Sequence, residues 1–213
     1  MQGDDAGGGA HGGLPLLQPM SDIAGRLATQ MGALGLHKLH GGNGKLITGM
    51  PGVPPAHVVI IGAGPCGLFA GLILAQMGFR PIILERGKAV RERTQDTWGL
   101  WRKGKLNPES NVQFGEGGAG TFSDGKLYSQ IKDPAYRGRK VLTEFVEAGA
   151  PPEIVYVSKP HIGTFRLVSM IEKMRAKIID LGGEIRFGAR VEDFDIERAA
   201  EGQGRIRGVV LAN

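Results

Sequence analysis

The chain has 213 residues, which is enough for one good-sized domain or for one domain and part of a second. Its formal charge is +5, but no block of consecutive basic residues occurs and only 6% of the residues are aromatic, so nucleic-acid binding is not expected. The single cysteine, Cys66, excludes an intramolecular disulfide, a CxxC redox pair and a cysteine-rich zinc site. The N-terminus is acidic and glycine-rich and predicts no secretory signal, which together with the lone cysteine favours a cytoplasmic protein.

The region before His57 is expected to form a leader of low structural content. Residues 1–13 are glycine-rich and of low complexity, which predicts disorder. Residues 14–39 show weak helical spacing of apolar positions, and residues 41–55 contain the loop signals GGNG and PGVPP. The predicted organisation is therefore a tail (1–13), a helix-and-loop leader (14–56) and a main domain (57–213).

The main domain begins with a strand, a glycine turn, a helix and a second strand. Val58 to Ile61 is a short apolar run typical of a strand buried on both faces. The turn spans Gly62 to Gly67, the helix Leu68 to Met77 with Gly78 as its stop, and the second strand Pro81 to Leu84. Elements of this length predict a right-handed parallel crossover. The uncharged stretch from Val58 to Phe79 could pass for a membrane span, but the strand, turn and buried helix explain it better.

The remainder predicts further helices and strands. Helices are expected at Ala89–Lys103, Arg139–Ala148 and Arg166–Leu181, separated by a polar, glycine-rich loop at Asn107–Gly125 and by the prolines at 151 and 152. In the last helix an apolar face is formed by Leu167, Met170, Ile171, Met174 and Ile178. Period-two segments at 184–187, 190–196 and 205–211 predict a meander of strands. The expected fold class is α/β, a Rossmann-like FAD/NAD(P)-binding domain with a parallel sheet, crossover helices and a β-meander.

The glycine turn carries the strongest functional signal. In Gly62-x-Gly64-x-x-Gly67 the first glycine permits the tight turn, the second admits a pyrophosphate, and the third allows close packing of helix and strand. The helix N-terminus then presents free N–H groups and its positive dipole end to the phosphates. Glu85 ends the second strand, where a carboxylate accepts hydrogen bonds from an adenosine ribose, and an acid there argues against a 2′-phosphate.

A second glycine cluster, Gly115 to Gly125, follows the βαβ unit. Its glycines, with Thr121 and Ser123, could bring backbone N–H donors to another part of a long cofactor, which favours FAD over NAD. The alternative is a flexible surface loop without a ligand.

Between Val58 and Asn213 the chain contains these distinctive segments: VVIIGAGPCGLFAGLILAQMGFRPIILERGKAVRERTQDTWGLW, NPESNVQFGEGGAGTFSDGKLYSQIKD, SKPHIGTFRLVSMIEKMRAKI and GGEIRFGARVED. They resemble the N-terminal part of an uncharacterised family of bacterial FAD-dependent dehydrogenases in the glutathione-reductase-type flavoprotein superfamily. The resemblance implies FAD, with Arg86 beside the adenosine, the Gly117 to Thr121 loop facing the flavin half and the Val191 backbone at the adenine. Family members continue well beyond this length, so the domain is expected to be incomplete at its C-terminus.

The residues expected to bind the cofactor, from the fingerprint and from this resemblance together, are Gly62, Gly64, Pro65, Cys66, Gly67, Glu85, Arg86, Gly117, Gly118, Gly120, Thr121 and Val191. No catalytic residue and no metal site is predicted.

A different resemblance covers the residues upstream. Residues 13–59, with MSDIAGR and PGVPP, resemble the segment that precedes the NAD domain of alanine dehydrogenase. The chain therefore looks like two dinucleotide-binding proteins joined at a shared strand.

Several other residues have both a functional and a structural interpretation. Cys66 is expected to be a small buried residue rather than a redox centre, because it has no partner cysteine. His161 could donate a proton near a flavin, but a loop histidine is more often structural. Trp98 and Trp101 could stack on a ring, although core packing is the preferred interpretation.

The sequence thus leaves three functions open. The first is an FAD-dependent oxidoreductase that transfers a hydride to or from a small-molecule substrate, with NAD(P) as a further possible ligand. The second is an NAD-dependent amino-acid dehydrogenase similar to alanine dehydrogenase. The third is a protein that binds a dinucleotide without catalysing a reaction.

Overall fold

The computed structural model describes residues 57–127, 133–134, 136–198 and 204–212. The predictions for the tail at 1–13 and for the leader at 14–56 lie outside these residues. None of the helices in the described ranges is long and apolar enough to cross a membrane.

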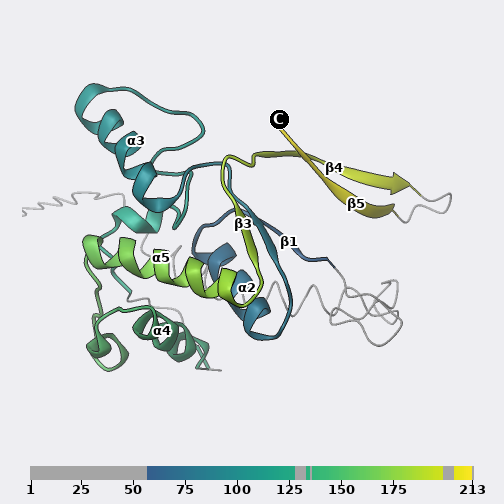
Figure 1. Ribbon diagram of the computed structural model, residues 1–213. Coiled ribbons are helices and arrows are strands. Elements are labelled where there is room, and N and C mark those ends of the chain that lie inside the picture. Colours follow the sequence, from purple (N-terminus) through teal and green to yellow (C-terminus); the bar gives the residue numbers. More distant parts are fainter. Residues whose placement is uncertain (1–56, 128–132, 135, 199–203, 213) are drawn as a thin grey trace, which may run out of the picture.

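A three-stranded parallel sheet organises the domain (Figure 1). Strands β1 (Val59–Ile61), β2 (Ile82–Leu84) and β3 (Glu184–Arg186) lie side by side in that order. Helix α2 (Pro65–Gln76) connects β1 to β2, and Ile60 pairs in register with Ile83. The parallel crossover predicted for this segment is confirmed, and the fold is the expected α/β, Rossmann-like type.

Helix α2 begins at Pro65, three residues before the predicted start at Leu68. Proline suits the first helical turn because its φ is already near the helical value and its missing N–H would have no partner there. Gly64 is the N-cap, so the helix starts inside the glycine fingerprint and the turn is shorter than predicted. The C-terminal end agrees with the prediction, since Met77 caps the helix and Gly78 follows with φ +85°.

The core lies between the sheet and two helices. The neighbouring residues Ile60, Ile83 and Ile185 occupy one row across the three strands. Helix α2 packs closely on this row, because a Cβ at Gly71 would come within 2.5 Å of the Ile83 side chain. Helix α5 (Thr164–Asp180) packs beside α2, and all five residues of its predicted apolar face are buried. This part of the prediction is confirmed.

The opposite face of the sheet is less covered than predicted. Val59 and Ile61 are 41% and 53% exposed, so the prediction that the first strand is buried on both faces is wrong. Strand β1 is the edge of the sheet, and the helices α2 and α5 cover only the side that Ile60 faces.

The other helices surround this core. Helix α3 (Val90–Lys103) and helix α4 (Arg137–Glu147) agree with the predicted ranges within two residues. Two short 3₁₀ helices, η2 (Ala119–Phe122) and η3 (Pro152–Val155), lie in the connections. Phe69 of α2 meets Phe145 of α4 edge to face at 5.3 Å between ring centroids, which joins α4 to the core.

The C-terminal strands differ from the predicted meander. Strand β3 pairs with β2 in the parallel sheet, whereas β4 (Val191–Arg198) and β5 (Gly204–Leu211) form a separate antiparallel pair. This pair projects away from the helices in Figure 1. Apolar and polar residues alternate in the same way in an edge strand of a parallel sheet and in a strand of an antiparallel pair. The sequence pattern therefore could not predict which strand β3 pairs with.

Candidate functional site

A cleft of about 360 Å³ opens beside the C-terminal end of the sheet. Its lining residues come from four segments: Ile61, Gly62 and Gly64 at the end of β1 and in the fingerprint turn; Leu84, Glu85 and Arg86 at and after the end of β2; Gln113, Phe114, Gly115 and Gly118 of the glycine-rich loop; and Ala189, Arg190 and Val191 before and in β4. In α/β sheets, ligands bind outside the carboxyl ends of the strands, which is the position of this cleft.

The three fingerprint glycines have distinct physical reasons. Gly62 has φ +93°, a conformation that other residues rarely adopt. A Cβ on Gly67 would lie 1.8 Å from the carbonyl oxygen of Gly62, so the helix can approach the turn only with glycine here. A Cβ on Gly64 would meet no atom within 4 Å, although this residue lines the cleft. The space that a side chain would fill at Gly64 is therefore available to a phosphate group beside the N-terminus of α2.

Glu85 is only 4% exposed and its carboxylate organises the backbone around it. Oε2 accepts a hydrogen bond from Ala63 N at 2.7 Å, and Oε1 accepts one from Gly87 N at 2.8 Å. Each carboxylate oxygen has a second lone pair, so a ribose hydroxyl could still donate to it. Glu85 thus joins the end of β2 to the fingerprint turn while it lines the cleft.

The glycine-rich loop packs directly against the fingerprint. Gly117 N donates a 2.8 Å hydrogen bond to Ala63 O, and a Cβ at Gly118 would lie 3.2 Å from Pro65 Cδ. On its other side, a Cβ at Gly87 would come within 2.6 Å of the Gly115 backbone. The glycines permit these close backbone contacts, so the loop forms a fixed wall of the cleft rather than a free surface loop.

A buried arginine holds this loop in place. Arg93 of α3 is fully buried and donates to the carbonyl oxygens of Asn111 at 2.7 Å, Val112 at 2.6 Å, Glu116 at 2.7 Å and Gly118 at 2.8 Å. Burial lowers the pKa of Arg93 to about 10, against the opposing effect of nearby carboxylates. The guanidinium remains charged at neutral pH and satisfies backbone groups that would otherwise be costly to bury.

Glu116, within the same loop, is also completely buried. Its Oε2 accepts hydrogen bonds of 2.8 Å from Val90 N and from Arg175 Nη1 of α5, whereas its Oε1 has no partner among the described residues. Burial raises the pKa of Glu116, although the Val90 N–H and Arg175 act in the opposite direction. The sequence analysis did not single out Arg93 or Glu116, because their roles depend on partners that lie far away in the sequence.

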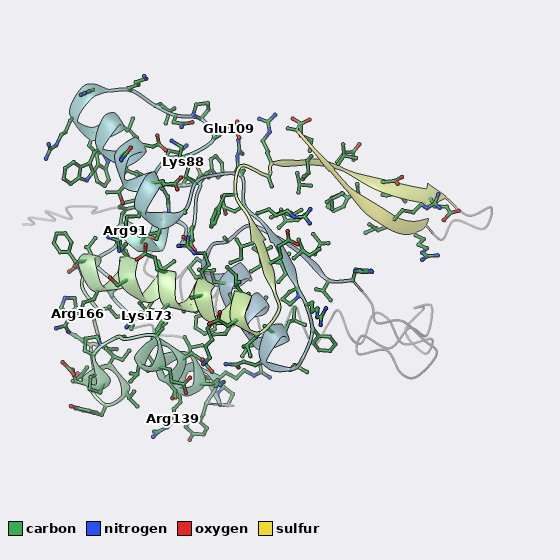
Figure 2. All side chains as sticks on the ribbon, in the orientation of Figure 1. Lys88, Arg91, Glu109, Arg139, Arg166 and Lys173 are labelled. Carbon is green, nitrogen blue, oxygen red and sulfur yellow. The ribbon has the colours of Figure 1, made fainter. Side chains whose placement is uncertain are left out.

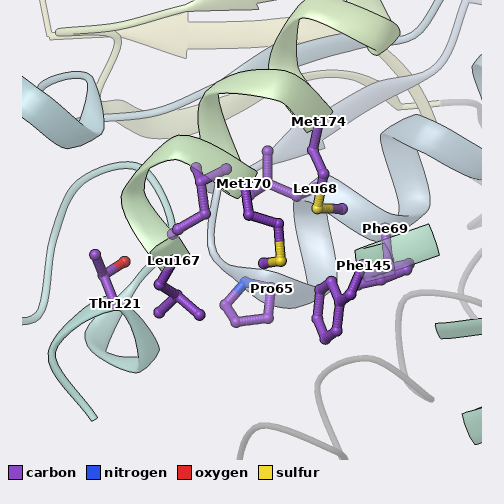
Figure 3. Close-up of a pocket in the computed structure, with 10 residues that line it drawn as sticks. Pro65, Leu68, Phe69, Thr121, Phe145, Leu167, Met170 and Met174 are labelled. Carbon is purple, nitrogen blue, oxygen red and sulfur yellow. The ribbon is translucent and has the colours of Figure 1, made fainter. Parts of the chain in front are cut away.

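The predicted cofactor residues divide into groups. Those that line the cleft are Gly62, Gly64, Glu85, Arg86, Gly118 and Val191. Pro65, Gly117 and Thr121 line a different, mostly apolar pocket of about 20 Å³ between α2, α4 and α5, together with Met170 and Met174 (Figure 3). Gly67 is buried in the helix–turn contact, and Cys66 and Gly120 are partly exposed and line neither space. The structure therefore brings half of the predicted set together at one cleft.

Other residues highlighted in the sequence lie away from the cleft. Trp98 and Trp101 are 50% and 58% exposed, so the preferred interpretation of core packing is wrong for both. Trp101 meets Phe122 edge to face, and Arg102 lies over the ring of Trp98. His161 is exposed, with Nε2 3.6 Å from Asp124 Oδ2. Within the described ranges no group of His, Cys, Asp or Glu side chains could hold a metal ion.

The parallel βαβ unit, the glycine fingerprint and the acid at the end of β2 define a Rossmann-like dinucleotide-binding domain. The comparisons with known proteins agree with this class. Residues 28–106 match the family model "Alanine dehydrogenase/PNT, C-terminal domain", which includes the fingerprint and Glu85.

Two relatives extend further along the chain. An uncharacterized protein of Clostridium beijerinckii is 51% identical over 156 residues, which is 73% of this chain and 28% of that protein. An alanine dehydrogenase of Bilophila wadsworthia is 48% identical over 134 residues, 63% of this chain and 34% of that enzyme. The chain thus spans about a third or less of these relatives.

Two solved structures align with part of the chain. Thermovibrio ammonificans THI4 matches 73% of this chain and 46% of its own length at 23% identity, with a TM-score of 0.44. An L-alanine dehydrogenase matches 45% of this chain and 25% of its own length at 37% identity, with a TM-score of 0.34.

Proposed function

We propose that this chain forms the dinucleotide-binding part of an oxidoreductase and holds the ADP half of its cofactor in the cleft beside Gly64 and Glu85. The proposal rests on one observation: Gly64, Glu85 and residues of the 113–118 loop line the same cleft of about 360 Å³. The open space where a Gly64 side chain would lie fits a pyrophosphate, and the Glu85 carboxylate fits a ribose.

We favour NAD as the dinucleotide. The alanine dehydrogenase family model covers the fingerprint, helix α2 and Glu85, and the Bilophila wadsworthia enzyme is 48% identical over 134 residues. NAD would supply hydride transfer, and the protein would bind and orient it. In this interpretation the substrate-binding residues would belong to parts of the relatives that the chain does not span.

FAD is the second candidate, and the glycine-rich loop favours it. This loop is hydrogen-bonded to the fingerprint turn through Gly117 N and Ala63 O, and Gly118 extends the wall of the cleft beyond Gly64. A backbone wall of this kind suits a cofactor that continues past the pyrophosphate. It also agrees with the resemblance of residues 58–213 to FAD-dependent dehydrogenases.

Titration of the purified chain with ADP, NAD and FAD, followed by calorimetry, tests the proposal. Binding of ADP and NAD without FAD would support the NAD-dependent function, and a yellow protein that retains FAD on purification would support the flavoprotein. Absence of ADP binding would refute the proposal as a whole. Alanine-dependent reduction of NAD would separate an active dehydrogenase from a domain that only binds a dinucleotide.

A further inference from the structure

Glu109 and two arginines form a charged group at the Glu85 end of the cleft. The Arg86 guanidinium donates from Nε to Glu109 Oε2 at 3.1 Å, and its Nη2 lies 3.0 Å from the same oxygen. Arg190 Nη1 donates to the other oxygen, Oε1, at 2.9 Å. One carboxylate therefore bridges two guanidiniums from segments that are far apart in the sequence. Figure 2 places Glu109 close to the segment that leads into β4.

Both arginines line the cleft next to the expected ribose position. Arg86 directly follows Glu85, and Ala189 N donates a 2.9 Å hydrogen bond to the Glu85 carbonyl oxygen, which fixes Arg190 on the neighbouring segment. The Arg86 guanidinium also lies 3.9 Å from the centre of the Phe114 ring. Contacts with the ring and with Glu109 thus hold Arg86 on two sides.

The charges at this end of the cleft are balanced by carboxylates. Arg190 is also paired with Glu192, and Glu85 adds a further negative charge at the ribose position. If Arg86 and Arg190 were unpaired, they would form the kind of site that binds a phosphate on the ribose, because guanidiniums bind phosphates through charge-assisted hydrogen bonds. Glu109 accepts hydrogen bonds from Arg86 Nε and Arg190 Nη1, and it places a negative charge beside the remaining donors.

We propose that Glu109 is a specificity-determining residue, which makes the cleft select an adenosine ribose with a free 2′-hydroxyl and reject one that carries a 2′-phosphate. Glu109 acts through Arg86 and Arg190, so it is a positioning residue rather than a catalytic one. This inference rests on the proposed placement of the ADP half in the cleft.

The test is calorimetric titration of the full chain and its variants with AMP and with adenosine 2′,5′-bisphosphate, which differ only in the 2′-phosphate, and with ADP as the check on nucleotide binding. The wild-type chain should bind AMP more tightly than the bisphosphate. In Glu109→Gln the ratio of the two affinities should move roughly tenfold toward the bisphosphate, because two guanidiniums lose their carboxylate partner. Glu109→Asp, which keeps the charge, should remain closer to the wild-type ratio.

Glu184→Gln is the matched control, because Glu184 forms a similar exposed ion pair with Arg186 and does not line the cleft. It should leave the ratio unchanged. A Glu109→Gln variant that keeps the wild-type ratio of the AMP and bisphosphate affinities would overturn the role of Glu109. An equal loss of affinity for both ligands would do the same, because it would indicate a purely structural role. Failure of the wild-type chain to bind ADP would instead refute the proposed function on which the inference rests.

Discussion

The backbone N–H of Ala63 donates a 2.7 Å hydrogen bond to the carboxylate of Glu85, across 22 residues of sequence. This bond joins the fingerprint turn after β1 to the end of β2. Because the same carboxylate also accepts a hydrogen bond from Gly87 N, the two glycine-bearing turns that border the cleft depend on one buried side chain. Glu85 therefore shapes the cleft in addition to its expected contact with a ribose.

Replacement of Glu85 by Gln should weaken both the fold and nucleotide binding. A Gln side chain has one acceptor oxygen, so either Ala63 N or Gly87 N would face an NH₂ group, at a cost of about 1–3 kcal/mol in the free energy of unfolding. ADP affinity should also fall, since the ribose would lose a charged acceptor. Urea denaturation and ADP titration measure the two effects, with the exposed Glu153→Gln as control. Unchanged ADP affinity would show that Glu85 does not contact the ribose.

Substitution of two fingerprint glycines by Ala should separate binding from folding. In Gly64→Ala the new Cβ meets no protein atom within 4 Å, so the stability should fall by about 1 kcal/mol or less, the cost of an Ala N-cap. ADP affinity should nevertheless drop, because the methyl group would occupy the space expected for the pyrophosphate.

In Gly67→Ala the Cβ would lie 1.8 Å from Gly62 O, so the helix or the turn must move and the stability should fall by about 3 kcal/mol or more. Thermal denaturation and ADP titration of both variants check the pair. Tight ADP binding by Gly64→Ala would contradict the placement of the phosphates at this residue.

Replacement of Arg93 by Met should detach the glycine-rich loop. The variant keeps much of the buried volume but removes every donor to the carbonyls of Asn111, Val112, Glu116 and Gly118. Buried carbonyls without partners should lower the stability by about 3 kcal/mol or more. Hydrogen exchange at Gly117 N, which bonds to Ala63 O, should become faster than exchange in the sheet. Equal protection in the variant and the wild type would show that other contacts hold the loop.

Glu144 of α4 should make the stability of the core depend on acid pH. Burial alone would raise its pKa, but hydrogen bonds from Lys140, Gln76 and Lys177 outweigh burial and hold the pKa below its ordinary value of 4.5. A carboxyl group whose pKa is lower in the folded state than in the unfolded state stabilises the fold at pH values above 4.5. This stabilisation is lost as the pH falls through the lower pKa of the folded state.

Glu144→Gln should therefore be less stable than the wild type by about 1–3 kcal/mol at neutral pH, with the difference shrinking at pH values below 4.5. Urea unfolding at a series of pH values measures this, with the exposed Glu147→Gln as the comparison. A difference that stays constant down to acid pH would exclude the ionised carboxylate as its source.

Local sequence patterns were sufficient for the elements and for one side of the cleft. The helical spacing from Leu167 to Ile178 predicted the buried face of α5, because burial of one face imposes that period. The spacing of Gly62, Gly64 and Gly67 predicted a turn that only glycine can form, and positive φ at Gly62 and the close contact at Gly67 agree with it. Glu85 was predicted from its position at the end of a strand, since that position is defined locally.

Tertiary structure decided what the remaining residues do. Whether Glu184 to Arg186 joined the parallel sheet, and whether Trp98 was buried, depended on which elements happened to cover them. The roles of Arg93 and Glu109 arise from partners that lie many residues away, and a sequence period carries no information on such pairings. The βαβ unit and its glycines are thus determined by local sequence, whereas the far wall of the cleft and its charge balance exist only because folding brings the 109–118 segment and Arg190 to the end of β2.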